Sequence, residues 1–192
     1  MRPKKIIVNT SDGKYPILIG KNVSFELGNL LRQNNIFSSK ILLVIDKNVP
    51  RTMVKKIKIS LKKKKYFIYL KSSEKNKSQK SVDKIIDILL KNNFSRSDCL
   101  ISIGGGIIGD ISAYAASIFK RGLLYVNVPT TLLAQVDSSI GGKTGINSKF
   151  GKNLIGSFYQ PRLVVSDISF LKSLPKREII CGYAEVCKHS LI

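Results

Sequence analysis

The chain has 192 residues and a formal net charge of +21, because 33 Lys and Arg stand against 12 Asp and Glu. With 43% hydrophobic residues it can bury the core of one large domain, or of one domain and the start of another, which excludes a disordered basic tail. No apolar run approaches the ~20 residues that a membrane span needs, and no signal-peptide core precedes the polar segment 9–12. The three cysteines are scattered, which indicates neither a disulfide framework nor a paired metal site. We therefore expect a cytoplasmic protein.

The positive charge by itself suggests nucleic-acid binding, but its distribution favours another explanation. The basic residues are 26 Lys and only 7 Arg, although recognition of bases and phosphates favours the bidentate Arg side chain. Residues 1–100 carry 23 basic and 7 acidic groups, and the densest basic run, 62–65, has no interleaved aromatic residues for base stacking. Lys, Ile and Asn all have A/T-rich codons, so a biased genome accounts for the composition. We expect neither nucleic acid nor a membrane as a partner.

The first hundred residues alternate strand-like and helix-like segments. Residues 4–8 and 15–19 are predicted strands, and a helix capped by Ser24 is expected to run to about residue 32. The continuous apolar run 40–45, followed by Asp46, is typical of a strand buried on both faces of a parallel sheet. A basic helix at about 49–61, a strand at 66–70, a polar loop at 71–77 and a helix from residue 78 or 81 complete this part.

The second half begins with a buried strand at 99–103, a glycine-rich turn, an Ala-rich helix to Phe119 and a strand at 123–128. This order predicts an α/β fold with a doubly wound, mostly parallel, Rossmann-like sheet. Residues 130–156 are rich in Gly, Ser, Thr, Lys and Asn, and we expect them to form an ordered loop region that lines a site. A last strand at 164–165 precedes a helix from residue 176, which reaches Ile192 without a C-terminal stop signal.

The glycine-rich turn has the spacing of a dinucleotide-binding motif. Gly104, Gly106 and Gly109 match G-x-G-x-x-G directly after a strand and at the start of a helix. Glycines let the backbone approach a pyrophosphate, and a helix N-terminus offers free N–H groups to it. The acidic residue that usually follows ~20 residues later is absent. Asp46, at the end of an earlier predicted strand, is the candidate partner for a ribose hydroxyl.

Two further groups of polar residues are candidates for a site. Lys143, Lys152 and Asn153 bracket a glycine-rich loop near Asp137, and they suit either an anionic, hydroxyl-rich ligand or a solvated basic loop. Glu185, Lys188 and His189 share a predicted helix face, because they are spaced i, i+3 and i+4. A single Glu/His pair is more often a surface contact than a metal site, since zinc takes three or four ligands.

Five segments resemble the 3-dehydroquinate synthase family. They are GGGIIGD at 104–110, FKRG at 119–122, VPTTLLAQVDSSIGGKTGIN at 128–147, GKNLIGSFYQP at 151–161 and GYAEVCKH at 182–189. The first hundred residues match more loosely, and the chain covers little more than half of the family's usual length. The resemblance implies an NAD-binding domain at 1–174, and the truncated first helix of an α-helical, metal-binding domain at 175–192.

The resemblance also implies site residues. The expected NAD contacts are Glu74, Lys77, Gly106, Ile107, Ile108, Gly109, Asp110, Thr130, Thr131, Lys143, Lys152, Phe170, Leu171, Lys172 and Ser173. Glu74 and Lys77 lie in a loop in which Ser72 and Ser73 replace the Asp-Gly pair of the family. The expected substrate contacts are Arg121, Asp137, Lys143, Asn153 and Lys188, with Arg121 reaching across a homodimer interface. Lys152, Asn153 and Lys188 are the expected catalytic residues.

For the metal, the resemblance implies Glu185 as the first of three ligands to zinc or cobalt, with two histidines beyond Ile192. His189 is not a ligand position in the family, so the chain by itself is expected to lack activity. The implied reaction converts 3-deoxy-D-arabino-heptulosonate 7-phosphate, a phosphorylated sugar acid, to 3-dehydroquinate and phosphate. It proceeds by transient oxidation with NAD, phosphate elimination, reduction and an intramolecular aldol step. The alternatives are a catalytically dead NAD-binding remnant, a related sugar-phosphate cyclase, or a metal-dependent polyol dehydrogenase.

Overall fold

A computed structural model describes residues 3–11 and 13–191. A seven-stranded sheet lies at its centre, with the strand order β1-β2-β9-β6-β5-β3-β4. The only antiparallel neighbours in this sheet, within the described ranges, are β1 and β2; the other adjacent strands are parallel. The predicted doubly wound, mostly parallel sheet is therefore confirmed. The strands are β1 (Lys4–Thr10), β2 (Gly13–Gly20), β3 (Lys40–Asp46), β4 (Lys64–Leu70), β5 (Cys99–Gly104), β6 (Leu124–Pro129) and β9 (Leu163–Asp167).

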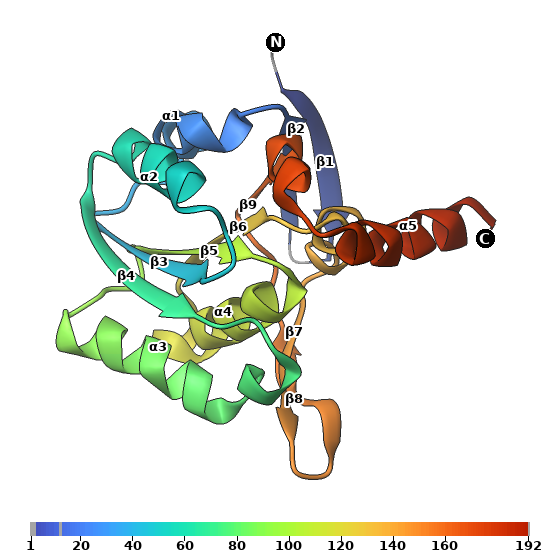
Figure 1. The fold of residues 1–192 in the computed structure, drawn as a ribbon. Coiled ribbons are helices and arrows are strands. Elements are labelled where there is room, and N and C mark those ends of the chain that lie inside the picture. The colour runs from blue at the N-terminus through green and yellow to red at the C-terminus, as the bar shows by residue number, and fades with distance from the viewer. Residues whose placement is uncertain (1–2, 12, 192) are drawn as a thin grey trace.

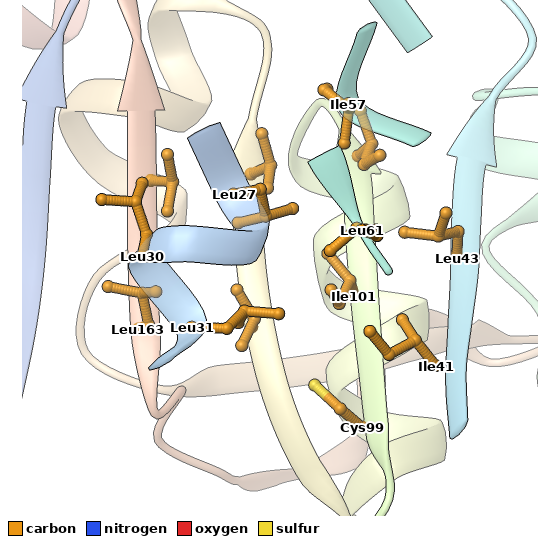
Figure 2. Packing of buried hydrophobic residues seen from close by; sticks show 14 of the residues in the cluster. Leu27, Leu30, Leu31, Ile41, Leu43, Ile57, Leu61, Cys99, Ile101 and Leu163 are labelled. Carbon is orange, nitrogen blue, oxygen red and sulfur yellow. The ribbon is translucent and has the colours of Figure 1, made fainter. Parts of the chain in front are cut away.

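Helices cover both faces of the sheet (Figure 1). The short helix η1 (Val23–Glu26), α1 (Leu27–Gln33) and α2 (Arg51–Ser60) pack on one face, and α3 (Gln79–Lys91) and α4 (Gly106–Ile118) pack on the other. The sequence of strand β3 is continuously apolar because its two faces pack against different hydrophobic cores. Ile41 and Leu43 belong to the first core, which Figure 2 shows and which also contains Ile57 and Leu61, whereas Leu42 belongs to the second.

Most of the remaining elements lie around the carboxyl ends of the parallel strands or extend from the sheet, whereas residues 119–121 join the C-terminal end of α4 to the amino end of β6. Helix α5 confirms the predicted helix from residue 176, and it projects from the domain with the C-terminus at its far end (Figure 1). No helix among the described residues is long and apolar enough to cross a membrane. These elements are η2 (Glu74–Asn76), η3 (Phe119–Arg121), the π-helical turn η4 (Ala134–Ser138), β7 (Lys143–Ser148), β8 (Gly151–Phe158), η5 (Ile168–Ser173) and α5 (Lys176–Leu191).

Two sequence predictions are wrong. Ser24 does not cap a helix: it lies inside η1, and its hydroxyl donates to Asp167 at 2.5 Å, so a contact with β9 takes the place of a cap. Residues 130–156 are not one loop region. They contain η4 and most of an antiparallel hairpin, β7–β8, which projects from the domain. The two strands pair closely because glycines face each other: a Cβ atom on Gly156 would lie 2.0 Å from the carbonyl oxygen of Thr144.

Candidate functional site

The glycine-rich turn lies where β5 ends and α4 begins, at the carboxyl edge of the sheet. No side chain of the described residues caps the N-terminus of α4, so its first N–H groups are available to an anion. A Cβ atom on Gly106 would lie 2.7 Å from the hydroxyl oxygen of Ser138. That oxygen is buried and has no hydrogen-bond partner within the described part of the chain. The turn thus combines close backbone access with an unsatisfied hydroxyl, which is the arrangement that a bound phosphate group would complete.

A buried hydrogen-bond network supports the first turn of α4 from below. The hydroxyl of Ser102 lies 2.8 Å from the hydroxyl of Tyr125 and donates to Asn127 Oδ1 at 2.9 Å. The Tyr125 hydroxyl in turn donates to the carbonyl oxygen of Gly109 at 3.2 Å. Burial raises the pKa of Tyr125, so it remains a neutral donor. Sequence reasoning missed this network, for which the only signal is two polar residues within apolar strands.

The first of two clefts, which we call the Asp46 cleft, has a volume of about 440 Å³ and lies at the carboxyl ends of β3, β6 and β9. Five predicted cofactor residues line it: Asp46, Thr130, Thr131, Phe170 and Ser173. The backbone N–H of Thr130 donates to the carbonyl oxygen of Gly104 at 2.9 Å, which joins this cleft to the glycine turn. Burial raises the pKa of Asp46, although hydrogen bonds from Asn48 and Ser72 oppose that effect.

The second cleft, the Asp137 cleft, has a volume of about 730 Å³ and lies between α4, η4 and the β7–β8 hairpin. Asp110, Asp137, Lys143 and Asn153 line it. These residues are predicted cofactor and substrate contacts from four separate segments, and the fold brings them together on one side of the glycine turn. Carboxylates, an amide and an ammonium group in one cleft suit a ligand that carries both hydroxyl groups and negative charge.

The loop before α3 is joined to both the hairpin and α4. The ammonium group of Lys77 forms an ion pair with Asp110 and a hydrogen bond with Asn153 Oδ1. Burial raises the pKa of Asp110, and the nearby Lys77 opposes this. Glu74 accepts a hydrogen bond from Asn147 Nδ2 at 2.9 Å, and it lies 3.7 Å from Lys152 Nζ. The loop at 72–77, which lacks the Asp-Gly pair of the family, is therefore still anchored to the hairpin and to α4 through Glu74 and Lys77.

Helix α5 brings a further polar group to the Asp137 cleft. One ligand atom from each of Asp137, Glu185 and His189 lies within 4.8 Å of the other two, and His189 Nε2 is 3.8 Å from both carboxylates. A hydrogen bond from Lys188 to Glu185 raises the pKa of Lys188, which remains a cation. Two carboxylates and an imidazole match the donor types and the number of protein ligands in catalytic zinc sites. The chemistry of the donors therefore fits a divalent cation, and Glu185 is not isolated from other donors.

Other predicted residues lie elsewhere. Arg121 follows the C-terminal end of α4, whereas the glycine turn precedes the N-terminal end. The residues Ile108 and Phe170 are 0% and 1% exposed and belong to the hydrophobic cores, although Phe170 also borders the Asp46 cleft. Ile107, Leu171 and Lys172 are also absent from the lining of both clefts.

A family model described as 3-dehydroquinate synthase N-terminal matches residues 67–181, which is more than half of the chain. The chain belongs to the 3-dehydroquinate synthase family. It is 61% identical over 189 residues to a 3-dehydroquinate synthase of Pelagibacter ubique (strain HTCC1062), and the match covers 98% of this chain and 51% of that relative. The chain thus spans about half the length of the curated relatives that it matches.

Solved structures with the same fold include two related sugar cyclases. One is 2-deoxy-scyllo-inosose synthase in complex with carbaglucose-6-phosphate, NAD+ and Co2+, with a TM-score of 0.89 and 25% identity over 98% of this chain and 52% of the other. The second is 2-epi-5-epi-valiolone synthase from Streptomyces hygroscopicus subsp. jinggangensis 5008 with NAD+ and Zn2+ bound, with a TM-score of 0.81 and 26% identity over 94% and 50% of the two chains. The family and the mostly parallel sheet agree with the sequence-based expectations.

Proposed function

We propose that this chain is the NAD-binding half of a 3-dehydroquinate synthase, which converts 3-deoxy-D-arabino-heptulosonate 7-phosphate to 3-dehydroquinate and phosphate. The observation that carries the proposal is the convergence of Asp110, Asp137, Lys143 and Asn153 on one cleft beside the glycine turn. The relative with 61% identity favours this activity over that of the cyclases, which are 25% and 26% identical. Residues 1–174 would form the NAD-binding domain, and 175–192 would form the first helix of a helical domain.

NAD would lie across the glycine turn. The backbone at Gly106 and the unsatisfied Ser138 hydroxyl would bind its pyrophosphate, and Asp46 would accept from a ribose hydroxyl. Glu185 would be the first of three ligands to zinc or cobalt, the other two being histidines from the rest of the protein, and Asp137 and His189 lie nearby. When bound, NAD supplies a hydride acceptor, and the divalent ion supplies a Lewis acid for the reacting hydroxyl.

The chain's own cations suit a phosphorylated sugar acid. Lys143 lines the Asp137 cleft, and Lys152 and Lys188 belong to the adjoining hairpin and α5. Their ammonium groups would attract the phosphate and the carboxylate of the substrate. Asp137 and Asn153 would orient its hydroxyl groups by hydrogen bonds. Lys152, Asn153 and Lys188 are the residues that we expect to affect turnover.

Arg121 would act from a second copy of the chain. The 13 residues of α4 separate Gly106 from Ile118 by about 20 Å, and Arg121 lies beyond that far end. An Arg side chain does not span this length, so Arg121 does not reach the glycine turn of its own chain. A homodimer that places Arg121 beside the partner's cleft would satisfy the family's substrate contact.

Calorimetric titration of the 192-residue chain with NAD tests the cofactor part of this proposal. Binding is expected, and Gly106→Val should weaken it by at least about tenfold, or ~1.4 kcal/mol, because the new side chain would displace the Ser138 hydroxyl that we propose binds the pyrophosphate. Lys75→Met, at an exposed position outside both clefts, should leave the affinity unchanged. A folded wild-type chain that gives no binding heat with NAD would contradict the assignment. For the whole protein, phosphate release from the heptulosonate phosphate is the corresponding assay.

A further inference from the structure

Lys77 is a buried lysine whose charged group contacts two different parts of the site. Its side chain is 8% exposed, whereas the side chain of Lys152 is 71% exposed. The Lys77 ammonium group pairs with Asp110, in the first turn of α4, and with Asn153, in strand β8. An unpaired ammonium group at this depth would be strongly destabilising, so these two partners account for its burial. Most of the group's hydrogen-bonding capacity is used inside the protein.

The backbone around Lys77 makes the same connection. Its carbonyl oxygen accepts from the backbone N–H of Asn147 at 2.8 Å, and the Asn147 side chain accepts from the N–H of Asn153 at 3.0 Å. Asn153 itself has a φ of 57°, a left-handed conformation that Asn tolerates better than most residues. Three segments that are far apart in the sequence therefore meet at one ammonium group: the loop before α3, the first turn of α4, and the hairpin.

The two partners of Lys77 belong to different halves of the site. Asp110 lies on the cofactor side, next to the glycine turn, and Asn153 lies on the hairpin that forms the substrate side of the Asp137 cleft. Ile146 of β7, in the second hydrophobic core, and the 2.8 Å hydrogen bond from Ser157 to Ser117 fix the base of the hairpin, so Lys77 is placed to fix the exposed part of β8 around Asn153. A change in the Asp110 environment on cofactor binding would therefore alter the contact that positions the hairpin.

We propose that Lys77 is a positioning residue that links the cofactor side of the site to the substrate side, by holding the β7–β8 hairpin against the first turn of α4. This role differs from that of a direct NAD ligand. The coupling of the two sides rests on the proposed NAD-binding function. The attachment of the hairpin does not, because it depends only on contacts within the chain.

Hydrogen exchange of the unliganded 192-residue chain tests the attachment. Lys77→Met removes the charge but keeps a side chain of similar length, and it should speed exchange of the amides at 147–153 by about tenfold. Asn153→Ala breaks the same contact from an exposed position, so it tests the attachment even if the Lys77 variant folds poorly by circular dichroism. Lys75→Met, two residues away and exposed, is the matched control and should change nothing. Unchanged exchange at 147–153 in Asn153→Ala, or in a folded Lys77→Met, would overturn the proposal.

A second series with saturating NAD tests the coupling. In the wild-type chain NAD should slow exchange at 147–153, and both Lys77→Met and Asn153→Ala should abolish this transmitted protection, whereas Lys77→Arg should retain part of it. If NAD protects the hairpin equally in all variants, Lys77 does not couple the two sides. If the wild-type chain does not bind NAD, the proposed function and the coupling both fail, and the unliganded series still decides whether Lys77 attaches the hairpin.

Discussion

A Cβ atom built on Gly182 would lie 2.6 Å from the Cβ atom of Leu132, so α5 packs against the segment before η4 with no space for a side chain. Gly182 is the only buried residue among those described in α5. The contact lies one turn before Glu185, and it places Glu185 and His189 beside Asp137. A residue without a side chain thus sets the geometry of the cluster of donors.

Gly182→Ala should release α5 from the domain. Helix propensity alone would favour Ala by ~1 kcal/mol, but the new methyl group would overlap Leu132. We expect faster hydrogen exchange of the α5 amides, with the sheet unaffected. Ala184→Gly, at an exposed position of the same helix, lowers the propensity without changing the packing and serves as the control. Slower exchange of α5 in Gly182→Ala would show that the close contact does not limit its docking.

Tyr125→Phe should destabilise the domain by ~1 kcal/mol, the usual net contribution of a hydrogen bond. The substitution removes the hydrogen bond that the Tyr125 hydroxyl donates to the carbonyl oxygen of Gly109, and the 2.8 Å contact with the Ser102 hydroxyl. Urea unfolding followed by circular dichroism measures the change. Tyr183→Phe removes a hydroxyl from an exposed ring and should leave the midpoint unchanged. Equal midpoints for Tyr125→Phe and the wild type would mean that the network contributes nothing to stability.

Asp98 should make folding stability depend on pH in the acid range. Burial opposes ionisation of this carboxylate, but hydrogen bonds from the backbone N–H groups of Ser95 and Lys40 outweigh burial and lower its pKa. A lowered native pKa means that the stabilisation is fully present above the ordinary value of 3.8 and is lost as the pH falls through the native value.

Asp98→Asn should therefore cost stability near neutral pH and flatten the decline between about pH 5 and pH 2. Free energies of unfolding in urea, measured across that range, give the two slopes. Asp87→Asn removes an exposed carboxylate from α3 and should keep the wild-type slope. If the stability of Asp98→Asn falls with pH as steeply as that of the wild type, other groups are responsible for the acid sensitivity.

Gly156→Ala should open the β7–β8 hairpin, because its methyl group would lie 2.0 Å from the Thr144 carbonyl oxygen. Trypsin should then cleave after Lys149 or Lys152 faster than in the wild type, while the thermal unfolding of the sheet changes little. Gly151→Ala is the matched control in the same hairpin, since its methyl group would meet only the end of the Leu154 side chain, at 3.1 Å. Equal cleavage rates in the two variants would argue against the tight pairing at Gly156.

The regular part of the fold could be predicted because its signals are local. The continuous apolar run of β3 and the periodic apolar face of α3 each correspond to one element of the structure. The hairpin could not be predicted in this way. Gly145 and Gly156 lower the strand propensity of β7 and β8. Their contribution is the close approach of the two backbones, which exists only when the strands are paired.

The candidate site shows the same division. The spacing of its glycines predicted the turn at Gly106, because the motif lies within a few residues. The contact between Lys77 and Asn153 joins residues 76 positions apart, and no sequence pattern indicates it. The proximity of His189 to Asp137 likewise depends on how α5 crosses η4. Family resemblance selects such residues, but only the tertiary structure shows which of them are neighbours.

The position of β9 has a consequence for synthesis of the chain. In the sheet, β9 lies between β2 and β6, so the N-terminal hairpin β1–β2 joins the other strands only through a segment made about 150 residues later. Asp167, at the end of β9, also accepts the backbone N–H groups of Asn22 and Ser24. During synthesis, β1 and β2 therefore cannot pair with the rest of the sheet until the chain has been made as far as residue 167. Until then the apolar side chains of β2, such as Ile17 and Leu18, lack the strand beside which they are buried in the folded domain.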